Sequence, residues 1–118
     1  MAARVVHVEF PARDADRAQK FYESVLGFSF SQPMEGMDYR MADLGEGQGA
    51  AVFPDESGQP GLRVYFGTDD IDASLAKVRE AGGEANDKMP VPQMGWFAPC
   101  KDPEGNAFSL WQSDSSAG

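Results

Sequence analysis

Hydrophobic and polar positions change their spacing near residue 11 of the chain, where one predicted element gives way to another. The segment Arg4–Phe10 is rich in valine and predicts a β-strand. Apolar side chains then recur at positions 18, 21, 22, 25 and 26, which is the spacing of an amphipathic helix. Asp14 is suited to cap the start of this helix, and Gly27 is suited to end it.

The same strand and helix pattern returns 56 positions later. Residues Leu62–Phe66 predict a strand, and Asp70 is placed to cap a second helix. The shift aligns Asp14 with Asp70 and His7 with Arg63. A supersecondary pattern that repeats at a fixed spacing indicates an internally duplicated fold.

The second part of each copy predicts three short strands, and here the shift between the copies is 58 positions. The expected strands lie near residues 28–31, 39–43 and 50–53, and then near residues 84–85, 95–101 and 107–112. The segment Asp102–Asn106 contains Pro, Gly and Asn and predicts a turn between the last two strands. Each copy therefore predicts a βαβββ unit.

A polar segment rich in Pro and Gly, residues 54–61, separates the two copies and predicts a linker. We expect one domain over residues 1–112, with its units at 4–53 and 62–112. The tail, residues 113–118, offers little apolar surface and predicts disorder. The fold class that follows is α+β.

Charge and composition limit the classes of partner. The net charge is −9, and nucleic acids and anionic membranes attract basic proteins, so neither partner is expected. The sequence contains no signal pattern and no apolar run of about 20 residues, which predicts a cytoplasmic protein. A chain of 118 residues buries only about two-thirds of its unfolded surface, and this favours a homodimer. The single cysteine, Cys100, predicts a packed thiol and excludes an intrachain disulfide.

Several segments resemble those of the vicinal oxygen chelate superfamily of glyoxalases, bleomycin-resistance proteins and dioxygenases. These segments are His7–Pro11, Arg17–Tyr22, Leu26–Phe28, Asp69–Ala73, Gly95–Phe97, Lys101–Asn106 and Leu110–Trp111. The resemblance covers residues 4–112 and is closest to small proteins related to lactoylglutathione lyase. It implies two tandem βαβββ units that form one curved mixed sheet, with a cleft for one small molecule. It also implies frequent dimers.

The resemblance identifies four strand positions that supply ligands in metal-using members, and in this chain they are His7, Ala51, Arg63 and Ser109. Only His7 is a competent ligand, because alanine has no donor atom, serine is weak and arginine is cationic. Glu9 shares a sheet face with His7, but two protein ligands are fewer than the three of a usual catalytic zinc site. We therefore expect no metal and no other cofactor; a divalent ion held loosely at His7 is the alternative.

Three side chains are candidates for acid–base chemistry without a metal. The imidazole of His7 titrates near neutral pH, and Glu9 can orient it or act as a base. Arg63 suits a carboxylate or enolate oxygen, because its fork of donors matches planar anions. The alternatives are that His7 is only a hydrogen-bonded remnant, and that Arg63 and Glu9 pair with each other.

Four further side chains, Tyr65, Trp96, Ser109 and Trp111, are candidates for the wall of a ligand-binding cleft. Tyr65 has the strand parity of Arg63, and Ser109 has that of Trp111. Trp96 is near several methionines in the sequence, and such side chains form adaptable apolar walls. Ordinary core packing is the alternative for each aromatic residue.

Three functions are compatible with these residues. The favoured one is a protein that binds an aromatic or amphiphilic small molecule in an apolar cleft without an intact metal site. The second is a metal-independent lyase or isomerase, in which His7 or Glu9 moves a proton and Arg63 stabilises charge. The third is a metal-dependent glyoxalase or dioxygenase, against which the ligand count argues. An enzyme requires the three polar side chains to converge on an open cavity, whereas a binding protein can have them paired.

Overall fold

The computed structural model describes residues 3–33, 36–57 and 61–118 of the chain, so residues 58–60 of the expected linker lie outside the described residues. The chain divides into two compact units. The first unit is His7–Arg63, and the second joins residues 3–6 to Val64–Gly118. No helix among the described residues is both long and apolar enough to span a bilayer.

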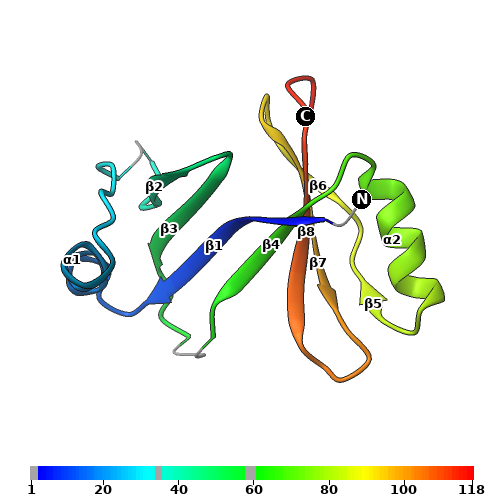
Figure 1. The fold of residues 1–118 in the computed structure, drawn as a ribbon, viewed down its shortest axis with the longest axis horizontal. Coiled ribbons are helices and arrows are strands. Elements are labelled where there is room, and N and C mark those ends of the chain that lie inside the picture. The colour runs from blue at the N-terminus through cyan, green and yellow to red at the C-terminus, as the bar shows by residue number, and fades with distance from the viewer. Residues whose placement is uncertain (1–2, 34–35, 58–60) are drawn as a thin grey trace. The chain divides into compact units, whose positions relative to one another are not determined.

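The first unit contains one helix and a three-stranded mixed arrangement (Figure 1). Its elements are the part of strand β1 (Arg4–Ala12) that follows Val6, helix α1 (Ala15–Leu26), strand β2 (Arg40–Gly45) and strand β3 (Gln48–Pro54). Strand β3 is central, because it pairs parallel with β1 and antiparallel with β2. The caps of α1 are as predicted: Asp14 accepts a hydrogen bond of 3.0 Å from the Arg17 N–H, and Gly27 has a φ of 72°.

The second unit has a similar order with two more strands. Its elements are β4 (Arg63–Gly67, from Val64 onward), α2 (Ile71–Glu80), β5 (Glu84–Ala85), β6 (Met89–Val91), β7 (Gly95–Lys101) and β8 (Ala107–Ser113). Strand β8 pairs parallel with β4 and antiparallel with β7, while β5 and β6 pair with different parts of β7. Asp70 caps α2 by accepting a 3.0 Å hydrogen bond from the Ala73 N–H, as predicted.

The registers of the two parallel pairs follow the internal repeat. In the first unit Glu9 is opposite Ala51, and in the second Tyr65 is opposite Ser109. The predicted shifts of 56 and 58 positions carry the first pair onto the second. The repeat and the α+β class are therefore confirmed by the strand pairing inside each unit.

Two strand predictions need correction. Residues 28–31 form no strand, although the Ser31 N–H donates to the Met41 carbonyl oxygen at 2.8 Å. The reason is local: the Met41 N–H donates to the Ser31 hydroxyl at 3.2 Å, so a side chain takes the place of the second backbone acceptor. Strand β6 was not predicted, because Pro90 at its centre weakens the strand signal and is tolerated only at a sheet edge.

The tail, for which the sequence predicts disorder, makes several contacts in the structure. The Ala117 carbonyl accepts a 2.9 Å hydrogen bond from the Gln93 N–H, and Ala117 is buried. The Asp114 carboxylate accepts a 3.0 Å bond from the Trp96 indole N–H. These contacts join the tail to the turn between β6 and β7 and to the start of β7.

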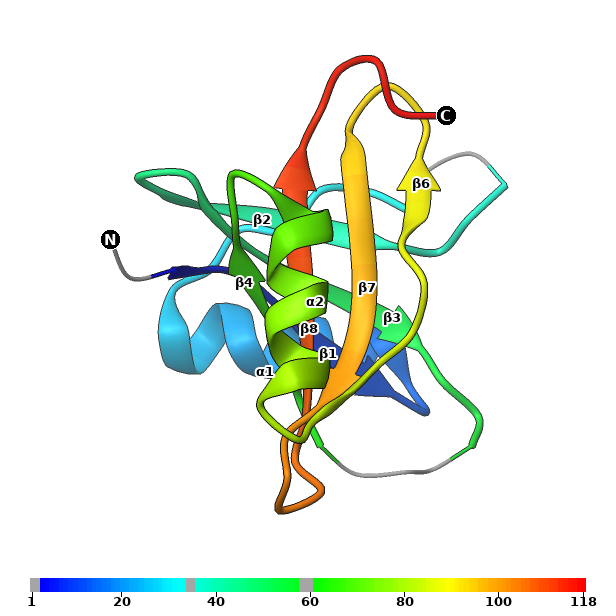
Figure 2. The ribbon, with the colours of Figure 1, turned by 90° about the vertical axis from the view of Figure 1, so that its right-hand side faces the viewer.

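Each helix covers one face of the strands of its own unit. Because side chains alternate along a strand, every second strand residue lies on the opposite face. In the first unit Phe10, Ala50 and Val52 pack in the core on the α1 side. In the second unit α2 packs against β7 and β8 through a core that includes Ile71 and Leu110 (Figure 2). The same core buries Cys100, and this burial raises the pKa of its thiol, as expected for a packed cysteine.

Arg40 joins α1 to the start of β2. Arg40 is only 8% exposed, and its guanidinium donates to Asp38 at 2.8 Å, to Asp16 at 2.7 Å and to Gln19 at 3.0 Å. The contact with Asp38 fixes the residues that immediately precede the strand. Arg40 therefore positions Tyr39, which lies between these two residues in the sequence.

We expect Arg40→Met to lower the free energy of unfolding by about 2 kcal/mol, because hydrogen bonds to charged groups are lost while most of the packing volume is kept. Urea unfolding at neutral pH measures this change. Asp16→Asn is the control, since the Asp16 side chain is 78% exposed and its pair is expected to contribute below about 1 kcal/mol. Equal losses in the two variants would contradict the role given to Arg40.

Candidate functional site

Three polar side chains form a connected chain on the face of the first unit opposite α1. His7 and Glu9 project from β1 on the side away from Phe10 and the helix core. Tyr39 reaches them from the segment before β2. Its hydroxyl lies 2.7 Å from His7 Nε2 and donates to Glu9 Oε2 at 2.6 Å. The chain therefore runs from imidazole to phenol to carboxylate.

The direction of these hydrogen bonds determines the tautomer of His7. A phenol has one proton, and the Tyr39 proton is directed to Glu9. Tyr39 must then accept from His7, which requires a proton on Nε2 of the neutral imidazole. Gly49 lies opposite His7, and a Cβ there would come within 3.3 Å of Nδ1, so the glycine leaves room for the ring.

Burial and charge act on His7 in opposite directions. Removal from water lowers the pKa of His7, and the nearby negative charge of Glu9 partly opposes this effect. Glu9 is itself only 8% exposed, so its carboxylate depends on hydrogen bonds in place of water. The neutral imidazole is consequently the favoured form of His7 at neutral pH.

This arrangement predicts a pH dependence of stability. The folded-state pKa of His7 lies below the ordinary value of about 6.5, so the unfolded chain binds the proton more readily. The stabilising contribution is complete above pH about 6.5 and is lost as the pH falls toward the folded-state pKa. Unfolding of the protein and of His7→Asn across this range should therefore show a steeper fall for the unchanged protein.

Nuclear magnetic resonance gives the direct value, because His7 is the only histidine of the chain. We expect its pKa to fall further in Glu9→Gln, since that change removes the charge that favours the imidazolium. A measured pKa at or above the ordinary value in the folded protein would contradict the burial of the ring.

Tyr39→Phe is expected to lower the free energy of unfolding by about 2 kcal/mol, because the buried Glu9 carboxylate loses a short hydrogen bond. Tyr22→Phe is a matched control in the same unit. Among the described residues the Tyr22 hydroxyl has no hydrogen-bond partner, and its ring packs on Phe10 at a centroid distance of 4.2 Å. If the two variants unfold at the same urea concentration, Tyr39 does not support Glu9.

Arg63 has a different carboxylate partner from the one considered from sequence. Its guanidinium pairs with Asp55 at 3.2 Å and lies over the Phe53 ring, 5.1 Å from the centroid. Phe53 in turn lies 6.1 Å from the Tyr39 ring, measured between centroids. Hydrogen bonds from Ser57, with a smaller contribution from Arg63, hold the pKa of Asp55 below its usual range. Arg63 thus contacts Phe53, and Phe53 contacts the Tyr39 ring, whose hydroxyl bonds to His7 and Glu9.

The structure places three of the four proposed ligand-binding residues on one face of the second unit. Tyr65 and Ser109 are direct partners in the β4–β8 pair, and Trp111 follows on the same face of β8. Gly95 makes room for Trp111, because a Cβ at Gly95 would come within 2.6 Å of the indole ring. Ser109 is buried. Phe108 and Leu110, the residues beside it in β8, point to the opposite face and pack in the core with α2.

Trp96 does not join this group. It packs with the α2 core, on the opposite side of the β7–β8 hairpin from Trp111. Its indole N–H donates to Asp114, and the Lys88 ammonium lies 4.6 Å from the centroid of its ring. The structure therefore gives Trp96 packing contacts in the helix core, which was the alternative stated for it.

Sequence reasoning did not identify Tyr39 or Phe53 as site residues. A signal was present for Tyr39, because it has the parity of Met41, and Met41 is opposite Ala51 on the face that carries Glu9. Phe53 has the parity of Ala51 in the same strand. Alternation within the predicted strands, applied to aromatic as well as polar residues, places both on this face.

The residues present do not fit the metal site that the superfamily resemblance implies. The Nε2 atom of His7 is engaged by Tyr39, Ala51 offers no donor, and Arg63 is paired with Asp55. Within residues 3–33, 36–57 and 61–118, no three His, Cys, Asp or Glu side chains lie close enough together to hold an ion. Glu9 and His7 converge on a phenol oxygen, which is a hydrogen-bonding partner for both.

Sequence relatives of this chain include proteins named as glyoxylases and lyases. The "Putative glyoxylase CFP32" of Mycobacterium bovis is 39% identical over 101 residues, which cover 80% of this chain and 38% of that protein. The "Probable lactoylglutathione lyase" of Vibrio cholerae is 31% identical over 126 residues, covering 93% of this chain and 91% of that protein. The chain thus spans less than half the length of the first relative and most of the second.

Solved structures of the same fold are more distant in sequence. Methylmalonyl-CoA epimerase from Mycobacterium tuberculosis has a TM-score of 0.72 at 18% identity, covering 93% of this chain and 87% of that one. A superfamily member from Vibrio splendidus has a TM-score of 0.69 at 19% identity, covering 95% of this chain and 100% of that one. A family model, "Glyoxalase/Bleomycin resistance protein/Dioxygenase superfamily", matches residues 4–110. The chain belongs to the glyoxalase, bleomycin resistance protein and dioxygenase superfamily.

Proposed function

We propose that this protein binds an aromatic or amphiphilic small molecule without a metal ion, on the first-unit face that carries Tyr39 and Phe53. The observation that carries the proposal is the Tyr39 hydroxyl, held between His7 at 2.7 Å and Glu9 at 2.6 Å. A phenol in this position engages the only imidazole of the chain. It also presents an aromatic ring beside Phe53.

The chemistry of this face suits recognition by stacking and by a small number of polar contacts. The Tyr39 and Phe53 rings are tilted by 32° to each other, and the Arg63 guanidinium makes a cation–π contact with the Phe53 ring. Met41 on the same face is 38% exposed and adds a polarisable apolar side chain. Apolar walls with a few fixed polar groups are typical of small-molecule sites, and the half-buried His7 supplies such a group.

A second candidate is a metal-independent lyase or isomerase. It is favoured by the two short hydrogen bonds, since a connected imidazole, phenol and carboxylate can pass a proton along the chain. Arg63 weakens this candidate, because its guanidinium pairs with Asp55 and lies over the Phe53 ring. A metal-dependent glyoxalase or dioxygenase is disfavoured by the donor set. Homodimer formation and a cytoplasmic location stay predictions, and mass in solution tests the first.

The test combines metal analysis with ligand binding. Protein purified without chelator or affinity tag is expected to contain no stoichiometric zinc, nickel, manganese or iron, and calorimetry with each ion should show no tight binding. A set of aromatic and amphiphilic compounds is then screened by the ring resonances of His7. We expect binders to shift these resonances, and Phe53→Ala to weaken binding by about tenfold through loss of a stacking surface.

Arg79→Gln is the control for this screen, because Arg79 is an exposed arginine of the second unit and pairs with Asp87 at 3.7 Å. It should leave affinity unchanged. Stoichiometric metal that is lost in His7→Ala would overturn the proposal and support the metal-dependent candidate. Turnover of a bound compound that disappears in Glu9→Gln would support the lyase or isomerase instead.

A further inference from the structure

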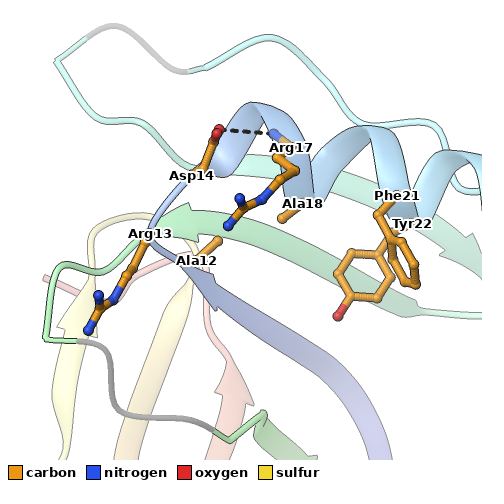
Figure 3. Close-up of a pocket in the computed structure, with 7 residues that line it drawn as sticks. All are labelled: Ala12, Arg13, Asp14, Arg17, Ala18, Phe21 and Tyr22. Carbon is orange, nitrogen blue, oxygen red and sulfur yellow. Dashed lines mark hydrogen bonds between the residues drawn. The ribbon is translucent and has the colours of Figure 1, made fainter.

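A hollow of the first unit lies beside helix α1, where β1 ends and the helix begins (Figure 3). Its volume is about 350 Å³. Ala12 on its wall has the strand parity of Phe10 and Val8, which pack on the helix side of β1. The hollow is therefore on the opposite side of the strand from His7 and Glu9, and it is separate from the site of the proposed function.

Two arginines line this hollow. Among the residues that the structure describes, the guanidinium groups of Arg13 and Arg17 have no carboxylate or other hydrogen-bonding partner. Arg40, Arg63 and Arg79 each pair with an aspartate. Acidic side chains outnumber Lys and Arg by 19 to 10, so two arginines on one hollow without a carboxylate partner are unexpected in this chain.

The acidic residue on the wall, Asp14, already serves as the N-terminal cap of helix α1. Its carboxylate accepts a 3.0 Å hydrogen bond from the backbone N–H of Arg17 and so caps the helix. Figure 3 shows the Arg17 side chain reaching back toward Ala12, while Arg13 extends on the other side of Asp14. Arg17 is thus the cation nearer the apolar part of the wall, and Arg13 stands at its edge.

The apolar part of the wall is formed by consecutive aromatic residues. The Tyr22 ring packs against the core residue Phe10, with ring centroids 4.2 Å apart. Phe21 meets Tyr22 edge-on at 5.2 Å and is 56% exposed, a large value for a phenylalanine. Cationic and aromatic surfaces therefore adjoin each other in one hollow.

We propose that this hollow binds a small amphiphilic anion, with its carboxylate or phosphate group on Arg17 and Arg13 and its apolar body on Phe21 and Tyr22. The fork of donors in a guanidinium matches both anionic groups. A soluble anion and a lipid headgroup share this chemistry. The net charge of −9 opposes approach to an anionic bilayer, so the soluble source is favoured.

Calorimetry with hexyl phosphate, inorganic phosphate and hexanol tests the proposal. Hexyl phosphate should bind more tightly than inorganic phosphate, because its chain is removed from water, and hexanol should not bind. Arg17→Gln should weaken hexyl phosphate by about tenfold, which is the loss of one charge-assisted interaction, and Arg13→Gln should weaken it less. Phe21→Ser should bring its affinity close to that of inorganic phosphate.

Two control variants and a vesicle experiment complete the design. Arg79→Gln removes an exposed arginine of the second unit and should leave the affinity unchanged. Tyr39→Phe alters the face of the proposed function and should also retain hexyl phosphate binding, so the two proposals can fail separately. Vesicles that contain phosphatidic acid should not sediment the protein.

Three results would overturn the inference. The first is no binding of hexyl phosphate, or equal binding of hexanol. The second is an equal loss in Arg17→Gln and Arg79→Gln, which would indicate a general effect of charge. The third is a loss of binding in Tyr39→Phe, or capture by vesicles without binding of the soluble anion.

Discussion

A carboxylate can be buried on a strand only where the fold supplies hydrogen-bond donors, and the organisation of the first unit follows from this requirement at Glu9. The group lies on the face without a helix, so its donors cannot come from α1. Tyr39 supplies one from the segment before β2. Arg40 then holds that segment by joining Asp38 to the helix residue Asp16. One buried charge thus connects the helix side of the unit to the opposite face.

The two units use one backbone plan with different side chains. The parallel pair that places Glu9 opposite Ala51 recurs as Tyr65 opposite Ser109. In the first copy this face carries the hydrogen-bonded His7, Tyr39 and Glu9, and in the second it carries Tyr65, Ser109 and Trp111. The two copies therefore share a backbone plan and differ in the chemistry of this face. This is why superfamily membership alone does not assign a reaction to the chain.

The features that sequence could predict are those set by neighbouring residues. The caps at Asp14 and Asp70, the repeat and the turn at Asp102–Asn106 each depend on local chemistry or on spacing. Alternation along the strand could place Tyr39 on this face, but its hydrogen bond to Glu9 spans 30 residues, and no local pattern encodes that partner. Arg63 found its partner in Asp55, which lies in the segment expected to be a linker.

The two incorrect expectations, for Trp96 and for a strand at residues 28–31, also concern contacts between residues that are distant in the sequence. Trp96 could be assigned to a face only once the register of β7 and β8 was known, and that register places Phe97, and not Trp96, opposite Trp111. The segment at 28–31 has strand-like residues, but the Ser31 hydroxyl competes for the backbone donor of Met41. Side chains that bond to the backbone change a strand without changing its hydrophobic pattern.

The two hydrogen bonds of the Tyr39 hydroxyl also have an entropic consequence. A tyrosine on a surface normally exchanges between rotamers, and immobilising such a side chain costs about 0.5–1.5 kcal/mol when a molecule binds to it. Folding has already restricted Tyr39, because its hydroxyl is held at 2.7 Å and 2.6 Å by His7 and Glu9. A molecule that stacks on this ring therefore meets a preorganised surface and loses little affinity to ordering it.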